Sequence, residues 1–74
     1  MNVEVRLFAT LRQGRFKRDT LALAEHSTVR EVFESLSIGP RDVSILLVNG
    51  REGQPDQGLA DGDVVSLFPG VGGG

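Results

Sequence analysis

The chain has no cysteine, a single histidine and no long apolar run among its 74 residues. Without cysteine it can have no disulfide, no thiolate metal site and no cysteine-bound iron–sulfur cluster. No segment reaches the roughly 20 apolar residues of a membrane-spanning helix, and residues 1–6 lack the apolar core of a signal peptide. We therefore expect a cytoplasmic protein with no metal site and no membrane partner.

A strong charge of either sign is also missing, since the net charge is −2. This mildly acidic balance does not favour nucleic acid as a partner. A chain of this length forms one domain, which buries only about 60% of its unfolded surface and has little interior for a catalytic pocket. We expect a binding or carrier protein rather than an enzyme.

Side chains that could perform chemistry are few. A single histidine, His26, makes neither a catalytic triad nor a metal site, so we expect it at the surface or at a helix cap. Asp61 and Asp63 flank Gly62, but the further ligands of a calcium loop are absent. We predict a turn at these residues, stabilised by the aspartate side chains.

Four basic residues lie close together in the first third of the chain: Arg12, Arg15, Lys17 and Arg18. They could contact a phosphate backbone, but only Phe16 places an aromatic ring among them and the whole chain is acidic. They could instead bind an acidic patch on a partner protein. An ordinary solvated turn is favoured over both interpretations.

Four segments have the hydrophobic pattern of strands: residues 3–7, 20–23, 43–48 and 64–68. The first two should pair as an antiparallel hairpin, with a helical turn in the stretch after the first strand. The third is a nearly continuous apolar run, which predicts a strand that is largely covered. Between the third and fourth segments we expect an irregular connection with Leu59 as its inward anchor.

One helix is predicted from an apolar stripe over residues 29–36, spaced at i, i+3, i+4 and i+7. Thr28 and Glu31 have the spacing of a capping box at its start. At its end, Ser37 and Ile38 are expected to be frayed before a Gly-Pro pair that stops the helix.

This order of elements predicts one mixed sheet of four to five strands with one helix packed across a face. That is an α+β fold with the outline of a β-grasp, or ubiquitin-like, roll. Its first and last strands are central neighbours, so the C-terminal residues leave from a rigid element. We expect residues 1–68 to form this domain and residues 69–74 to form a flexible Gly-Gly tail.

The tail has four glycines among its last five residues. Glycine is costly to order and packs no side chain, so folding stability does not explain this ending. Pro69 stiffens the exit and Val71 keeps an apolar group beyond it, whereas a frayed end tends to be polar. A Gly-Gly end is a slim backbone with a free carboxylate, which suits a partner's narrow active site. The C-terminal group itself is the predicted reactive site.

Three stretches, taken together, resemble a known family: residues 5–12, residues 47–50, and residues 59–69 with the final Gly73-Gly74. They resemble the small subunit of molybdopterin synthase, in the MoaD-like branch of the ubiquitin-like sulfur carriers. Gly70 stands where that branch commonly has a second proline, and Gly72 departs from it too. The Val-Gly-Gly-Gly ending is more similar to the ThiS-like thiamine sulfur carriers.

The resemblance implies a carrier that acts with partner proteins and binds no cofactor itself. A ubiquitin-activating (E1-like) adenylating enzyme would use ATP to activate Gly74, and a sulfur donor enzyme would convert the adenylate to a thiocarboxylate. The large subunit of molybdopterin synthase would then receive the sulfur, in the molybdopterin or tungstopterin pathway. Gly73 would let the backbone thread into a narrow site. The residues implied in partner binding are Phe68, Pro69, Val71 and Gly72.

Three other functions fit the same features. The chain could carry sulfur for the thiazole of thiamine, or it could be a protein modifier whose adenylate is captured by a lysine. It could also be a ubiquitin-like interaction domain with an inert tail. Isopeptide-linked adducts would identify a modifier, and normal function without Gly74 would identify an inert tail.

Overall fold

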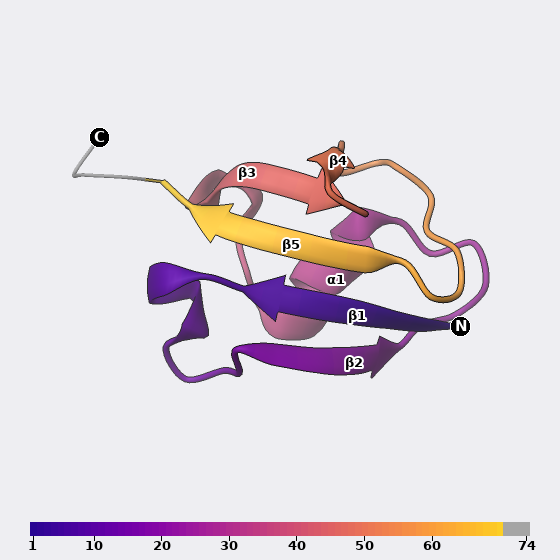
Figure 1. Ribbon diagram of the computed structural model, residues 1–74, viewed down its shortest axis with the longest axis horizontal. Coiled ribbons are helices and arrows are strands. Elements are labelled where there is room, and N and C mark those ends of the chain that lie inside the picture. The colour runs from indigo at the N-terminus through magenta and orange to yellow at the C-terminus, as the bar shows by residue number, and fades with distance from the viewer. Residues whose placement is uncertain (71–74) are drawn as a thin grey trace.

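The computed structural model describes residues 1–70, which form a five-stranded mixed sheet with one helix across one face (Figure 1). The strands are β1 (Asn2–Leu7), β2 (Arg18–Ala22), β3 (Val43–Val48), β4 (Arg51–Glu52) and β5 (Val64–Pro69). The helix is α1 (Val29–Leu36), and two 3₁₀ turns are η1 (Ala9–Arg12) and η2 (Pro40–Asp42). The predicted arrangement of one mixed sheet and one helix is confirmed.

The sheet has the strand order β2-β1-β5-β3-β4, so the first and last strands are central neighbours, as predicted. β1 and β5 run parallel, and their register places Leu7 beside Leu67. β3 runs antiparallel along the other side of β5. β5 is therefore held by a strand on each side over most of its length. The hairpin of β1 and β2 is antiparallel, which also confirms its prediction.

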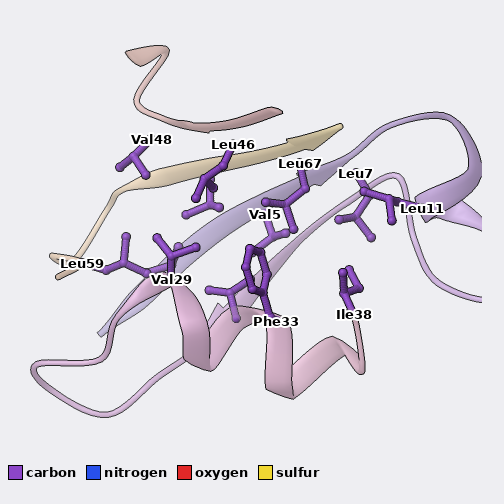
Figure 2. Packing of buried hydrophobic residues seen from close by; sticks show 13 residues of the cluster. Val5, Leu7, Leu11, Val29, Phe33, Ile38, Leu46, Val48, Leu59 and Leu67 are labelled. Carbon is purple, nitrogen blue, oxygen red and sulfur yellow. The ribbon is translucent and has the colours of Figure 1, made fainter. Parts of the chain in front are cut away.

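The core lies between the sheet and α1, because every second residue of the central strands points toward the helix (Figure 2). The buried apolar residues are Val3, Val5, Leu7, Leu11, Val29, Val32, Phe33, Ile38, Leu46, Val48, Leu59, Val65 and Leu67. Leu59 is the inward anchor predicted for the connection between β4 and β5. Leu21 and Leu23 pack against the edge of this core. No helix within residues 1–70 is long and apolar enough to cross a membrane.

The helix end differs from its prediction. Ser37 adopts a left-handed conformation (φ 55°) and its N–H donates to the Glu34 carbonyl, while the Ile38 N–H donates to the Phe33 carbonyl at 2.9 Å. This pair of bonds is a Schellman motif, which reverses the chain and satisfies the last carbonyls of the helix. It turns the Ile38 side chain into the core, so the prediction of a frayed end was wrong.

β3 also differs from its prediction of a largely covered strand. Leu46 and Val48 are buried under α1, but Ser44 is exposed and Ile45 keeps 51% of its surface in solvent. The helix covers one face of the sheet only, so the apolar residues of the other phase remain at the opposite face. That opposite face is called the outer face below.

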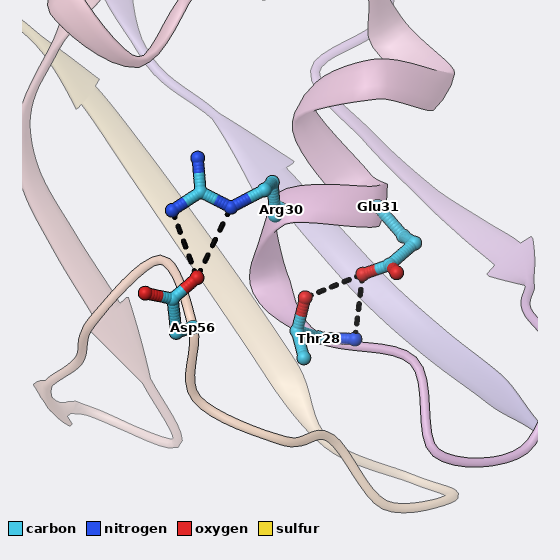
Figure 3. A network of polar contacts seen from close by, with 4 residues as sticks. All are labelled: Thr28, Arg30, Glu31 and Asp56. Atoms are coloured by element: carbon cyan, nitrogen blue, oxygen red, sulfur yellow. Dashed lines mark hydrogen bonds and ion pairs between the residues drawn. The ribbon is translucent and has the colours of Figure 1, made fainter.

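The start of α1 has the predicted capping box (Figure 3). The Thr28 main-chain N–H donates to a Glu31 carboxylate oxygen at 2.8 Å, and the Thr28 hydroxyl donates to the same oxygen. These bonds lower the pKa of Glu31 from its ordinary value, the hydroxyl contributing most. Arg30 forms an ion pair with Asp56 at 2.8 Å, which links the helix start to the connection after β4.

Replacing Thr28 by alanine should lower the free energy of unfolding by about 1 kcal/mol, the usual cost of losing an N-cap residue. Urea denaturation at neutral pH measures this, and Ser35→Ala, an exposed substitution inside the same helix, should change it by less than about 0.5 kcal/mol.

The same comparison has a pH dependence. A lowered carboxyl pKa stabilises the fold above the unfolded value near 4.5, and this contribution is lost as pH falls through the lowered value. The difference between Thr28→Ala and the parent chain should therefore shrink in acid. If the difference in free energy of unfolding between the two proteins stayed constant as the pH fell through the lowered pKa of Glu31, the role of the Glu31 carboxylate would be contradicted.

Candidate functional site

The root of the C-terminal tail lies at the end of the central strand β5. Pro69 is still part of this strand, one residue beyond the predicted end, and lies opposite Val43. Gly70 follows and is exposed, and within residues 1–70 no atom apart from its chain neighbours lies within 4 Å of the position that a Cβ would take. The other predicted tail residues, Val71, Gly72, Gly73 and Gly74, lie outside the described residues. The structure thus gives the position and direction from which the tail starts.

An aromatic pair stands next to this root. The rings of Phe8 and Phe68 are stacked, with centroids 4.1 Å apart and an interplanar angle of 7°. The Arg12 guanidinium lies 5.4 Å from the centroid of Phe8, and its Nε donates to the Leu7 carbonyl at 2.7 Å. The pair therefore joins the ends of the two parallel central strands.

Apolar residues continue from this pair across the outer face. Ile45 lies opposite Phe68 in the register of β3 and β5, and Leu47 follows two residues later on the same face. We call Phe8, Ile45, Leu47 and Phe68 the apolar patch. Ile45 is exposed and the other three side chains are half-buried. Apolar side chains gathered on an uncovered sheet face are a candidate surface for protein association, because their exposure costs free energy in water. The patch and the tail root together form the candidate site.

Phe68 and Pro69 were predicted as partner-binding residues, and the structure places both at this site. Sequence reasoning missed Phe8, Ile45 and Leu47, although a signal was present. Ile45 and Leu47 fall in the polar phase of β3, whose other phase is buried, and Phe8 stands directly after β1 at the next position of its polar phase. A large apolar side chain at such a position adds nothing to the core under α1. Apolar residues out of phase with the core would have revealed them.

The remaining candidate side chains have structural surroundings. His26 is exposed in a turn, with a left-handed φ of 67°. The Asp61 carboxylate accepts the Asn2 main-chain N–H at 2.7 Å, and Asp63 accepts the Ala60 N–H and the Asn49 side-chain amide at 2.9 Å. These bonds confirm the predicted turn. Within residues 1–70, no three His, Cys, Asp or Glu residues are grouped as metal ligands would be.

The basic cluster of the sequence divides in the structure. Arg15 donates to the carbonyls of Leu36 and Ser37 at 3.0 and 3.2 Å and to Leu11 at 3.2 Å. A cation at the C-terminus of a helix can donate hydrogen bonds to the free carbonyls of the last turn, and it interacts favourably with the helix dipole. Arg15 therefore has a structural role. Lys17 and Arg18 are exposed at the start of β2.

Comparison with known proteins identifies relatives over the whole chain. The sequence model of the ThiS family matches residues 5–74. None of the curated proteins matches the chain.

Among solved structures, a protein of Pyrococcus furiosus assigned as molybdopterin converting factor subunit 1 is 32% identical, with 96% of this chain and 99% of that chain covered and a TM-score of 0.78. The HVO 2177 protein of Haloferax volcanii is 33% identical over 100% of this chain and 87% of its own, with a TM-score of 0.81. A chain from the complex of molybdopterin-converting factor subunits 1 and 2 of Helicobacter pylori is 26% identical, with both chains fully covered and a TM-score of 0.65. These structures confirm the β-grasp fold.

The aromatic pair should contribute to stability through its stacking. A double-mutant cycle of Phe8→Ala and Phe68→Ala should give a coupling energy of about 1 kcal/mol, since stacked rings gain roughly that beyond their burial. Urea denaturation of the four proteins measures it. The matched cycle of Phe16→Ala with Phe68→Ala should be additive within about 0.5 kcal/mol. Additivity in both cycles would show that Phe8 and Phe68 do not stack in solution.

Proposed function

The chain belongs to the ThiS family, and from that premise we propose that it is a sulfur carrier whose C-terminal glycine, Gly74, is converted to a thiocarboxylate. The sulfur that it carries would be used to make molybdopterin or the tungsten-binding form of that cofactor. Similarity to the molybdopterin converting factor subunit of Pyrococcus furiosus supports this pathway over thiamine. The chain itself acts as a carrier, in the cytoplasm, and its partners supply the catalysis.

The observation that carries this proposal is the position of β5. The strand is bonded to β1 on one side and β3 on the other, and its end is fixed further by the Phe8–Phe68 stack. Residues after Pro69 therefore start from a rigid platform, which lowers the entropic cost of directing a short backbone into a partner's site. Gly73, next to the reacting residue, would let the backbone enter a site whose walls a Cβ would meet.

The chemistry needs an activated carboxylate. A carboxylate is a poor electrophile, so an adenylating enzyme would join the Gly74 carboxyl oxygen to the α-phosphorus of ATP, with release of pyrophosphate. Sulfide supplied by a donor enzyme would then attack the carbonyl carbon. A carbon–sulfur bond forms, the carbon–oxygen bond to AMP breaks, and AMP leaves. The sulfur is carried on the main chain, as a group is carried by a cofactor arm, and no cysteine is required.

The acceptor of the sulfur would be a large-subunit partner. A structural relative, from Helicobacter pylori, comes from a complex of subunits 1 and 2 of molybdopterin-converting factor, which supports such a partner. The apolar patch offers it a docking surface beside the tail root. Phe8 and Phe68 would be its main anchors, because aromatic residues in the centre of an interface contribute most of its binding energy.

Charging of the C-terminus tests the proposal. Incubation with the adenylating enzyme and sulfur donor of the same organism, ATP and a sulfur source should raise the intact mass by one oxygen-to-sulfur exchange. Deletion of Gly74 should abolish this change without altering the thermal unfolding midpoint. Gly70→Ala should be charged normally, because within residues 1–70 the added methyl group meets no atom within 4 Å apart from its chain neighbours.

Other results would support the competing functions. An unchanged mass with the cognate enzymes would contradict the proposal. Isopeptide-linked adducts without a thiocarboxylate would favour a protein modifier, and undiminished cellular function of the chain lacking Gly74 would favour an inert tail.

A further inference from the structure

A basic hollow lies beside the apolar patch, at the same end of the sheet as the tail root. It has a volume of about 450 Å³, and its lining residues are Arg6, Leu7, Phe8, Arg12, Lys17 and Arg18. Four of these side chains are cationic and none is a carboxylate. Phe8 belongs both to this hollow and to the apolar patch, so the two surfaces are continuous.

Arg12 is held in a fixed orientation at this hollow. Its Nε donates to the Leu7 carbonyl and its guanidinium lies over the Phe8 ring. Within residues 1–70, the terminal nitrogens of Arg12 have no hydrogen-bond acceptor. A guanidinium positioned in this way presents its remaining donors for a planar carboxylate at a small entropic cost.

The pairing of Arg6 with Arg18 gives a second, independent indication. These residues lie directly opposite each other in the register of β1 and β2, and like charges in this position destabilise a sheet. Glu4 neutralises Arg6 through an ion pair at 2.5 Å, but within residues 1–70 Arg18 has no ion-pair partner. Folding gains nothing from this arrangement, and such local conflicts are expected at functional sites.

The charges of the molecule are also separated along its length. At the end of the sheet with the tail root, basic residues outnumber acidic ones. The basic residues there are Arg12, Arg15, Lys17, Arg18 and Arg41, and the acidic ones are Asp19 and Asp42. At the other end of the sheet, where β5 begins (Figure 1), acidic residues outnumber basic groups. The acidic residues there are Glu25, Glu31, Glu52, Asp56, Asp61 and Asp63, against Arg30, Arg51 and the Met1 amino group. An acidic partner surface is therefore attracted to the tail end and repelled by the opposite end, which orients the approach.

We propose that the basic hollow binds an acidic segment of the adenylating enzyme that receives the tail. Carboxylates of that segment would pair with Arg12, Lys17 and Arg18, and an adjacent apolar side chain would contact the Phe8–Phe68 stack. This inference rests on the proposed function, because the adenylating enzyme is the one that would activate Gly74. It assigns a role to three of the four clustered basic residues, and Arg15 keeps its structural one.

Binding of the full chain to the adenylating enzyme of the same organism tests this inference by isothermal titration calorimetry. Arg18→Glu should weaken binding about tenfold at low salt, because it replaces an attraction by a repulsion at the interface. Arg51→Glu makes the same change of charge on the far edge strand, β4, and should bind like the parent chain. Added salt should weaken the binding of the parent chain to the enzyme more than it weakens the binding of Arg18→Glu.

Adenylation kinetics separate the two proposals. The KM for Arg18→Glu should rise about tenfold with kcat unchanged, since binding is affected and the reacting carboxylate is not. Adenylation of Arg18→Glu with the parent KM and affinity would overturn the hollow's role alone. A parent chain that is neither bound nor adenylated would overturn both proposals. Tighter binding of the parent chain to a 20-nucleotide DNA than to the enzyme, lost in Arg18→Glu, would overturn this inference in favour of nucleic acid.

Discussion

The parallel pairing of β1 with β5 in the middle of the sheet is the constraint on which the other features depend. Parallel strands carry their C-terminal ends to the same edge, so the residues that follow β1 and those that follow β5 must meet there. This pairing sets Phe8 beside Phe68 and brings Arg12 to the root of the tail. A polar segment from the first quarter of the chain thereby becomes part of a site around its last residues.

The two faces of the sheet have different tasks. The face under α1 is closed by a well-filled core, and the buried side chains of residues 1–70 have no unsatisfied polar atom. The outer face keeps Ile45 largely exposed and sets Arg18 against Arg6. Each of these features lowers stability or solubility in the isolated chain, so each is better explained by a partner that covers it. The covered face holds the strand in place, and the uncovered face is available for recognition.

Most of the fold could be predicted from the sequence, because it follows from periodicity and local capping signals. The stripe of α1, the Thr28–Glu31 box and the alternation of β1 all act over a few residues. The errors came where the outcome depends on distant or geometric factors. Ile38 is drawn into the core by a left-handed residue that is not glycine. Ile45 is exposed because α1, the one α-helix within residues 1–70, covers the other face of the sheet.

The site was predicted only in part for the same reason. Phe68 and Pro69 were found from their proximity to the glycines. Phe8 joins them through a strand pairing that spans sixty positions, which no local pattern contains. Arg15 could not be separated from its basic neighbours, because its role depends on the carbonyls at the end of α1.

We propose above all that the chain acts through its C-terminal carboxyl group. Fragmentation mass spectrometry of the protein isolated from its own cells tests this most directly, because it locates any sulfur to a single residue. We expect a fraction of molecules in which one carboxyl oxygen of Gly74 is replaced by sulfur. Sulfur at any other position, or none in any copy while molybdopterin is being made, would contradict it.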